Sequence, residues 1–323
     1  MSEIKATTPE SSGVSLDGKA LKQLTRRSDR PGLVTLGLWA LFLAASGTLL
    51  FFSQGTWGVV PAMILYGSIL TVPAYSLSHE CAHGTAFRTR WLNELVFWVT
   101  SLVYFQGPHF RRYAHARHHT YTWIRAMDAQ MPFNTPLTLK GWLLEMSDLG
   151  QYVYDGGHML RNALGRFDAE VIAFTPAGEL PKLKWESRIF LTLILAGAAA
   201  AATGSLWVLT FLVIPRLVGG VTMQLFTVIQ HAELAEDQHD LTKSTRSFTT
   251  NWFADFLYAN MSSHLEHHLY PVVPFHALPR LNAALSDQLP APSRGLFRTN
   301  AEVLGAIVRR SLGRSAVAGE KPA

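Results

Sequence analysis

The sequence predicts an all-α integral membrane protein with about four transmembrane helices and a cytoplasmic helical cap. The composition is apolar, with 48% hydrophobic and only 16% charged residues, whereas charged residues make up about a quarter of an ordinary soluble domain. Four apolar stretches can be laid out as bilayer-crossing helices. Most of the histidines gather in three short clusters beside these stretches. A membrane bundle that carries one polar site accounts for all three observations.

The chain begins with a polar segment and two apolar stretches. Residues 1–30 are rich in serine and threonine and are expected to be a disordered tail. Residues 33–53 and 58–78 are uncharged and long enough to cross about 30 Å of hydrocarbon. The tail is basic, and the link between the two stretches carries no charge. Because cytoplasmic segments collect positive charge, the tail and the end of the second stretch are expected in the cytoplasm.

The middle of the chain is less clearly apolar. Residues 92–106 are short for a full crossing and contain Glu94, so a re-entrant or interfacial segment is expected. Residues 137–187 mix charges with Trp142, Trp185 and aliphatic residues, which is typical of amphipathic helices on the membrane face. The alternative is a soluble cap over the site. Because residues 92–106 are not expected to cross the bilayer, the second histidine cluster stays on the same side as the first.

The last apolar region divides into two helices. Residues 189–203 and 206–229 are separated by a turn, and this second pair of crossings returns the chain to the cytoplasm. Arg216 lies within the second helix, where a charge costs about 2.5–3.5 kcal/mol on insertion scales. It either reaches the lipid headgroups or anchors the anionic head of a substrate. Trp57 and Trp207 adjoin the two external turns, as expected of aromatic residues at a membrane interface.

These assignments predict one membrane domain at 31–285 and a cytoplasmic C-terminal tail at 286–323, with both termini in the cytoplasm. The net charge of +5 suits either nucleic acid or an anionic leaflet. The apolar stretches favour the leaflet, so no nucleic-acid partner is expected. The single cysteine, Cys81, excludes internal disulfides and a cysteine-ligated iron–sulfur cluster, and is expected to be a packing residue.

The histidine clusters have the spacing of metal ligands. Residues 79–83 read HECAH, residues 115–119 read HARHH, and residues 264–268 read HLEHH. On a helix, positions i, i+3 and i+4 share one face, and neutral imidazole is the commonest metal ligand in proteins. A single zinc site uses about four ligands. Two ions would therefore use the whole candidate set, which is His79, His83, His115, His118, His119, His231, His264, His267 and His268.

Other functions use the same residues differently. HECAH matches the H-E-x-x-H signature of zinc proteases, in which Glu80 would be the general base, but such an enzyme does not need seven further histidines. A non-enzymatic metal carrier or sensor could use the same histidines to bind metal without catalysing a reaction. Beside a metal cage, Glu80 and Glu266 are candidates for carboxylates that orient ligand imidazoles. Asn260, one turn before His264, is a further candidate. Each of the three could also be an ordinary polar residue of a helix face.

The clusters resemble the histidine boxes of the membrane fatty acid desaturase and hydroxylase superfamily. The resemblance rests on the pattern HxxxH, HxxHH and HxxHH with an extra histidine before the last box, and on HLEHHLYPVVPFHALP at 264–279. It covers roughly residues 33–285. It implies a non-haem di-iron centre held by the nine histidines, O₂ as co-substrate, and a fatty acyl or other hydrophobic substrate drawn from membrane lipid. The remaining histidines fall outside the boxes and are expected at the surface or behind the ligands: His109, His158, His239 and His276.

The resemblance leaves the reaction open. Desaturation of an acyl lipid is the first expectation. Hydroxylation, oxidative demethylation and decarboxylation to a terminal alkene are alternatives, since HECAHGTAF and QHAELAED are similar to bacterial hydrocarbon oxygenases and demethylating monooxygenases. The chain lacks the HPGG haem box of a fused cytochrome b5 domain. A separate donor of the ferredoxin type and a bacterial inner membrane are therefore expected. A group of arginines either attracts such a donor or serves topology alone: Arg88, Arg90, Arg111, Arg112, Arg117 and Arg125.

Overall fold

A computed structural model of the chain describes residues 9–131 and 135–313. Within these ranges the protein is helical, with no β-strand and one isolated bridge between Phe248 and Ser293. Four helical stretches are long and apolar enough to cross a membrane. They are α2 (Asp29–Phe52), α3 (Val59–His83), α9 (Leu180–Ala202) and a composite stretch at Leu206–Gln230. The predicted helical membrane fold is confirmed.

The composite stretch changes its helical geometry along its length. It consists of α10 (Leu206–Val208), the π-helical η3 (Leu209–Val213), α11 (Ile214–Thr227) and the 3₁₀ turn η4 (Val228–Gln230). Pro215, the second residue of α11, has no N–H to donate, so the hydrogen-bond ladder is interrupted just after the π segment. α9 begins at Leu180, nine residues before the predicted start at 189. Because the first turns of α9 contain charged residues, hydropathy alone placed the beginning of this helix too late.

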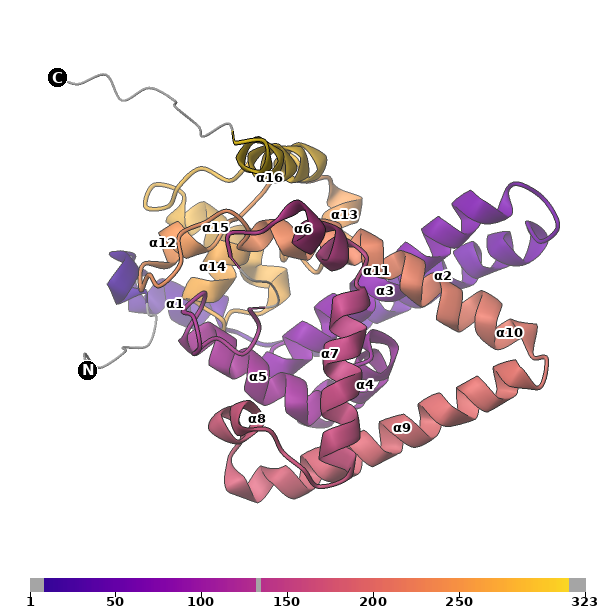
Figure 1. Ribbon diagram of the computed structural model, residues 1–323. Coiled ribbons are helices and arrows are strands. Elements are labelled where there is room, and N and C mark those ends of the chain that lie inside the picture. The colour runs from indigo at the N-terminus through magenta and orange to yellow at the C-terminus, as the bar shows by residue number, and fades with distance from the viewer. Residues whose placement is uncertain (1–8, 132–134, 314–323) are drawn as a thin grey trace.

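The four stretches form two hairpins whose connecting turns lie at the same side of the molecule (Figure 1). The ring of Phe51, at the end of α2, stacks on Trp207 of α10 with centroids 5.8 Å apart. Trp57 is 94% exposed in the first turn. The two turns therefore lie together, as the even number of crossings predicted. The helices that carry the second and third histidine clusters, α5 (Pro108–Thr120) and α14 (His264–Leu269), lie at the opposite side (Figure 1).

α3 and α11 pack backbone to backbone at two glycines. A Cβ added to Gly219 would lie 2.0 Å from the carbonyl oxygen of Gly67 and 2.3 Å from Oγ1 of Thr71. A Cβ added to Gly67 would lie 2.4 Å from the carbonyl oxygen of Pro215. Small residues allow this close approach, which is how many membrane helices associate. Because α3 ends in the first histidine cluster and α11 leads to His231, this contact sets the spacing of both.

Two shorter helices join the hairpins to the site. α4 (Arg90–Tyr104) packs along α3 and is not among the four long stretches, and α5 (Pro108–Thr120) follows Gly107. The carboxylate of Glu186, on α9, accepts hydrogen bonds from the backbone N–H groups of His109 and Phe110 at 2.7 and 2.9 Å. An acidic group at a helix N-terminus is favourable because it pairs with otherwise unbonded N–H groups. This contact fixes α5, which carries the second cluster.

The rest of the chain forms the cap. One part consists of α6 (Leu139–Met146), α7 (Leu149–Ala163), α8 (Ala169–Phe174) and η2 (Ala177–Glu179). The other consists of α12 (Leu241–Ser244), α13 (Trp252–Leu257), α14 (His264–Leu269), η5 (Phe275–Ala277), α15 (Leu278–Leu285) and α16 (Leu296–Ser311). α6 contacts α11 and α16, and α7 contacts α9. The amphipathic segment expected at 137–187 therefore packs against the bundle as well as presenting an outer apolar face.

Arg216 has neither of the roles expected from the sequence. It is 7% exposed and pairs with Asp148, whose Oδ2 lies 2.9 Å from its Nη1. Its Nε and Nη2 donate to the carbonyl oxygens of Val103 and Tyr104. The other oxygen of Asp148 accepts from Gln224 at 2.8 Å. The charge is therefore neutralised inside the protein, where it joins α11 to the end of α4 and to the α6–α7 junction.

The two terminal segments are ordered parts of the fold. Residues 9–30, which were expected to be disordered, form η1 (Glu10–Ser12) and α1 (Gly18–Leu24) before α2 begins. Val14 and Leu24 are buried in the main core, and apolar burial overrides the polar composition. α16, expected to be part of a tail, buries Val303 and Ile307 against the same core. Residues 1–8 and 314–323 lie outside the described residues.

Candidate metal centre

The candidate ligands come together in two groups. The first contains five histidines: His79, His83, His115, His119 and His267. The second contains four: His118, His231, His264 and His268. Within each group, one ring nitrogen from each residue lies within 4.8 Å of the others. The structure thus brings together all nine residues selected from the sequence, and α5 and α14 contribute to both groups.

The nitrogen separations suit a shared ion. In the first group, Nε2 of His115 lies 2.9 Å from that of His83 and 3.1 Å from that of His119. In the second, Nε2 of His264 lies 3.1 Å from that of His231 and 3.0 Å from that of His268. Two nitrogens bound to one ion at about 2.1 Å lie roughly 3.0–3.4 Å apart at octahedral to tetrahedral angles. Each group therefore has the dimensions of a ligand set.

Outer hydrogen bonds fix which ring nitrogen carries the proton. Nδ1 of His118 donates to the Asp128 carboxylate at 2.9 Å, and Nδ1 of His231 donates to the carbonyl oxygen of Ser244 at 2.9 Å. Thr122 uses its hydroxyl proton on the backbone, so its Oγ1 accepts from Nδ1 of His268 at 3.0 Å. A neutral imidazole protonated at Nδ1 presents a lone pair at Nε2.

The second group fits a cation for this reason. The Nε2 lone pairs of His118, His231 and His268 face a common point with His264. His264 has at most one Nε2 proton, which can satisfy one of these three lone pairs. In the first group, His115 is oriented in the same way, because its Nδ1 donates to Oε1 of Gln130 at 2.6 Å. Buried lone pairs that converge without enough protons between them are stabilised by a metal ion.

Six of the ligands, all outside the membrane-spanning helices, have a lowered pKa that favours the neutral imidazole. Burial, followed by the electrostatic effect of the neighbouring ligand histidines, lowers the pKa of His231 to about 3. The same causes hold the pKa of five further ligands well below the usual value: His115, His119, His264, His267 and His268. Since only a deprotonated nitrogen binds a metal, the protein presents these ligands in the competent form.

The three polar residues predicted to orient ligands lie close to the cage but do not hydrogen-bond an imidazole. Oε2 of Glu80 accepts from the Thr85 hydroxyl and the Phe275 N–H, and Oε1 stays 3.8 Å from Nδ1 of His79. Glu266 accepts from the Ser247 hydroxyl at 2.5 Å and from Asn282. Asn260 donates to the carbonyl oxygen of Phe275 at 3.1 Å. These residues hold the segments around α14 in place.

The side chains outside the cage that hydrogen-bond its imidazoles come from a loop. Asp128 and Gln130 follow α5 in the 121–131 segment, and Asp128 also accepts from the backbone N–H groups of Trp123 and Gln130. Burial raises the pKa of Asp128, but His118 and these N–H groups lower it, and the net direction is downward. Asp128 lies ten positions beyond His118, and Gln130 lies 15 positions beyond His115. Helical periodicity gives no signal for loop residues at such separations, so sequence reasoning missed both.

The remaining histidines lie outside the two groups, as expected. Nδ1 of His109 lies 2.8 Å from Glu186, and that of His158 lies 3.2 Å from Asp168. His239 and His276 are partly buried elsewhere in the cap. Cys81 is fully buried within the main core, which confirms its assignment as a packing residue.

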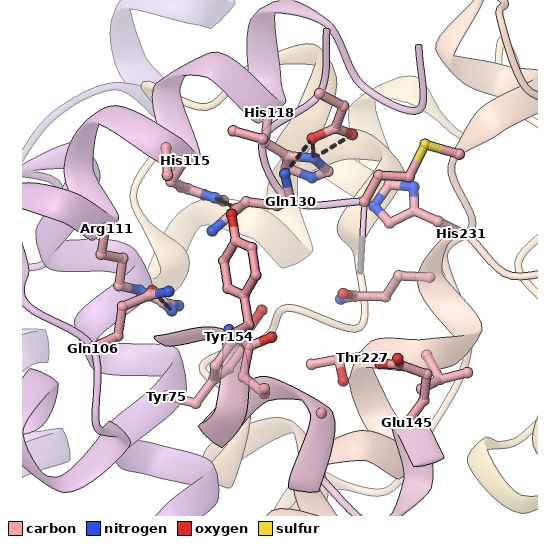
Figure 2. A pocket seen from close by; sticks show the side chains of 18 of the residues that line it. Tyr75, Gln106, Arg111, His115, His118, Gln130, Glu145, Tyr154, Thr227 and His231 are labelled. Atoms are coloured by element: carbon pink, nitrogen blue, oxygen red, sulfur yellow. Dashed lines mark hydrogen bonds and ion pairs between the residues drawn. The ribbon is translucent and has the colours of Figure 1, made fainter. Parts of the chain in front are cut away.

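A cavity of about 360 Å³ adjoins the histidine groups. His115 from the first group and His118, His231 and His264 from the second contribute to its wall. Figure 2 shows His115, His118 and His231 along one side of the cavity, with Thr227 and Glu145 opposite. A molecule held here would touch both groups.

The arginines expected to form one basic surface are in different environments. Arg111 is only 2% exposed and lies inside the protein, so its inclusion in a donor-binding surface is wrong. Arg112 pairs with Glu94 at 2.8 Å, and Arg125 pairs with Glu236. Arg88 and Arg90 are exposed. Pairing with acidic residues reduces the positive field that this face can present.

The fold and the site define a helical membrane protein in which two converging histidine groups adjoin one internal cavity. The family model described as fatty acid desaturase matches residues 54–299, and the chain belongs to this family. The membership supports an oxidoreductase of the desaturase type.

Two curated proteins are similar to the chain. Over 243 residues it is 22% identical to an sn-1 oleoyl-lipid 12-desaturase of Arthrospira platensis, covering 69% of this chain and 67% of that protein. Over 252 residues it is 22% identical to an sn-1 acyl-lipid omega-3 desaturase (ferredoxin) of Nostoc sp. (strain 36), covering 71% and 68%.

Proposed function

We propose that the nine histidines hold two iron ions, and that the protein is an O₂-dependent non-haem di-iron oxidoreductase acting on an acyl chain, with desaturation as the first expected reaction. The observation that carries this proposal is the division of the candidate set into groups of five and four, each with ligand-like nitrogen separations. Imidazole also suits zinc, copper and nickel; family membership favours iron.

The zinc protease alternative has less support. Glu80 would have to activate a water in a substrate site, but it is fully buried and one oxygen is engaged by Thr85 and Phe275. It does not contribute to the wall of the cavity. A protease site also leaves the second histidine group without a purpose.

The residues of the chain would orient and isolate the reaction. Bound iron supplies the reduction of O₂ and the capacity to remove hydrogen from an unactivated C–H bond. Asp128, Gln130 and the Ser244 carbonyl hold three imidazoles in fixed orientation and tautomer. The buried cage excludes bulk water from the reacting atoms.

The overall reaction balances with an external donor. In desaturation, the substrate loses two hydrogens, the donor supplies two electrons, two protons are taken up, and O₂ leaves as two waters. In hydroxylation, one oxygen atom enters the substrate and the other leaves as water, with the same two electrons and two protons. The cage is compatible with both outcomes, and hydroxylation, demethylation and decarboxylation remain alternatives to desaturation.

The donor and the membrane orientation are parts of the same proposal. The name of the Nostoc relative includes ferredoxin, and exposed Arg88 and Arg90 near the first cluster would favour an acidic partner of this kind. We expect a bacterial inner membrane with the histidine groups on the cytoplasmic side. Cysteine introduced at Gly55 should react with an impermeant maleimide on intact cells, whereas cysteine at Asp287 should react only after lysis. The reverse pattern would refute the orientation. Native Cys81 is buried and should not react with the maleimide.

Metal content and products test the chemistry. The purified chain should contain about two irons, and His267→Ala and His268→Ala should each lower this content, whereas the control His276→Ala should retain it. One zinc and no iron would refute the proposal. Expression in a heterologous bacterium, followed by mass spectrometry of lipids and volatiles, should reveal new double bonds, alcohols, alkenes or lost methyl groups, with His267→Ala as the blank.

A further inference from the structure

Two arginines of the described chain have deeply buried side chains, and they differ in their partners. Arg216 is neutralised by Asp148 at 2.9 Å. Arg111, which is 2% exposed, forms no ion pair with any carboxylate among the described residues. A buried charge without a counter-ion is costly. Such a charge beside a cavity is therefore a candidate binding group.

The guanidinium of Arg111 is held rigidly at the cavity wall. It lies over the rings of Tyr75 and Tyr104, at 4.7 and 4.5 Å from their centroids. Its Nη1 donates to Oε1 of Gln106 at 3.1 Å, and its buried Nε has no hydrogen-bond partner. The amide of Gln106 in turn donates to Asp155 at 2.8 Å. Arg111 is therefore linked to this carboxylate only through the side chain of Gln106. Figure 2 shows Arg111 and Gln106 together at one side of the cavity.

The position of Arg111 relates it to the histidine groups. It lies one turn before His115 on α5, and i and i+4 positions share one helix face. Arg111, His115 and His118 all contribute to the wall of the same cavity. An anion bound to Arg111 would therefore place its first carbon atoms beside the cage.

We propose that Arg111 binds the carboxylate of the substrate, and that the substrate is a compact free carboxylic acid rather than an acyl group esterified in a glycerolipid. A guanidinium can bind a carboxylate through two parallel N–H···O bonds. This inference rests on the proposed function, because it specifies the molecule that the same site oxidises. The proposed substrate differs from those of the two relatives, whose names describe desaturases of acyl lipids.

The size and polarity of the cavity support a compact acid. Its volume of about 360 Å³ is near the lower end of small-molecule pockets, which span about 300–1,000 Å³. Five glutamine side chains contribute to the wall: Gln106, Gln130, Gln151, Gln224 and Gln230. Most of these amides are hydrogen-bonded within the protein, and together they make the wall polar where a long saturated chain would need apolar contacts.

Ligand binding to the intact protein tests the carboxylate. The full chain, reconstituted in nanodiscs without added iron, is titrated by calorimetry with octanoate, methyl octanoate, octan-1-ol and octyl phosphate, with empty nanodiscs as the background. Octanoate should bind about 10- to 100-fold more tightly than the ester and the alcohol, the range expected for losing charged hydrogen bonds. Equal affinities for acid and ester would overturn the proposal. Equal or tighter binding of octyl phosphate would also overturn it, since the subsite would then belong to a phosphate head group.

Variants assign the effect to one residue. Arg111→Gln should abolish the preference for octanoate over its ester, and Arg111→Lys should retain part of it. Arg112→Gln is the matched control, because Arg112 is the neighbouring arginine and pairs with Glu94 at the surface. A full preference in Arg111→Gln would contradict the assignment. If this variant does not fold, the acid–ester comparison on the unaltered chain still decides.

The two proposals fail in different ways. Oxidation of the ester and the acid at equal rates by the iron-loaded protein would overturn the carboxylate subsite and leave the proposed function intact. A chain that prefers octanoate but holds no iron would retain the subsite and lose the proposed function.

Discussion

Substitution of Gly219 by alanine should separate the two helices on which the candidate metal centre depends. The added Cβ would lie 2.0 Å from the carbonyl oxygen of Gly67 and 2.3 Å from Oγ1 of Thr71. Non-bonded atoms of this kind rest at about 3.5 Å, so α3 and α11 must part by roughly 1.5 Å. The nearest of these atoms belongs to the backbone, which cannot relieve the collision by changing rotamer as a side chain can.

The expected change in stability of Gly219→Ala is the balance of helix propensity and overpacking. Alanine in a helix interior is favoured over glycine by about 1 kcal/mol, but overpacking a tight contact costs about 1–3 kcal/mol. Metal sites tolerate only about 0.2 Å of error in ligand distance. α3 carries His79 and His83, and α11 leads to His231. A displacement several times this tolerance should reduce both thermal stability and metal content.

Gly197→Ala provides the control for Gly219→Ala. Gly197 lies inside α9, and a Cβ added there meets nothing within 4 Å. This substitution makes the same chemical change without the collision, so it should be neutral or slightly stabilising. The assay is the thermal midpoint of both purified variants together with metal per chain. If Gly219→Ala retained the metal content and midpoint of Gly197→Ala, the inference that helix contact sets the ligand spacing would be refuted.

Three further predictions concern polar residues around the site. Asp128→Asn should weaken metal retention about 10- to 100-fold, measured by chelator competition; unchanged retention would mean that its bond to His118 is dispensable. Arg216→Leu leaves Asp148 buried and unpaired, so unfolding should become easier by about 3–5 kcal/mol; a stability loss as large in the Arg216→Leu, Asp148→Leu double variant would contradict this. Burial raises the pKa of Asp155 from 3.8 to about 7 in the folded state. The folded state therefore binds more protons between these values, and stability should fall as pH rises through this window. Asp155→Asn should flatten the pH dependence of the thermal midpoint, and an unchanged slope would exclude Asp155 as its source.

The histidine cage could be predicted because its information is local. His79 and His83, or His264 and His268, stand one helical turn apart, and this spacing alone places each pair on one face. The four long helices were also predictable, since hydropathy is summed over many residues. The hairpins then bring the clusters to one end, so topology could be inferred without any knowledge of contacts.

The rest depended on contacts between distant segments. From the sequence, Arg216 seemed to carry a free-energy cost in a membrane helix. Nothing in the sequence connects it to its ion-pair partner Asp148, 68 positions earlier. Asp128 orients an imidazole from a loop whose shape no periodicity encodes. The N-terminal segment was expected to be disordered because its composition is polar, yet burial of Val14 and Leu24 is sufficient to order it. Composition averages over a segment, whereas packing depends on a few side chains.

The sharing of α5 and α14 between the histidine groups couples their occupancy. α5 supplies His115 and His119 to one group and His118 to the other, and α14 supplies His267 to the first group and both His264 and His268 to the second. An ion in either group restricts both helices and so removes part of the ordering cost that the second ion would otherwise meet. Titration of the metal-free protein should therefore show positive cooperativity, with few singly loaded chains at half-saturation.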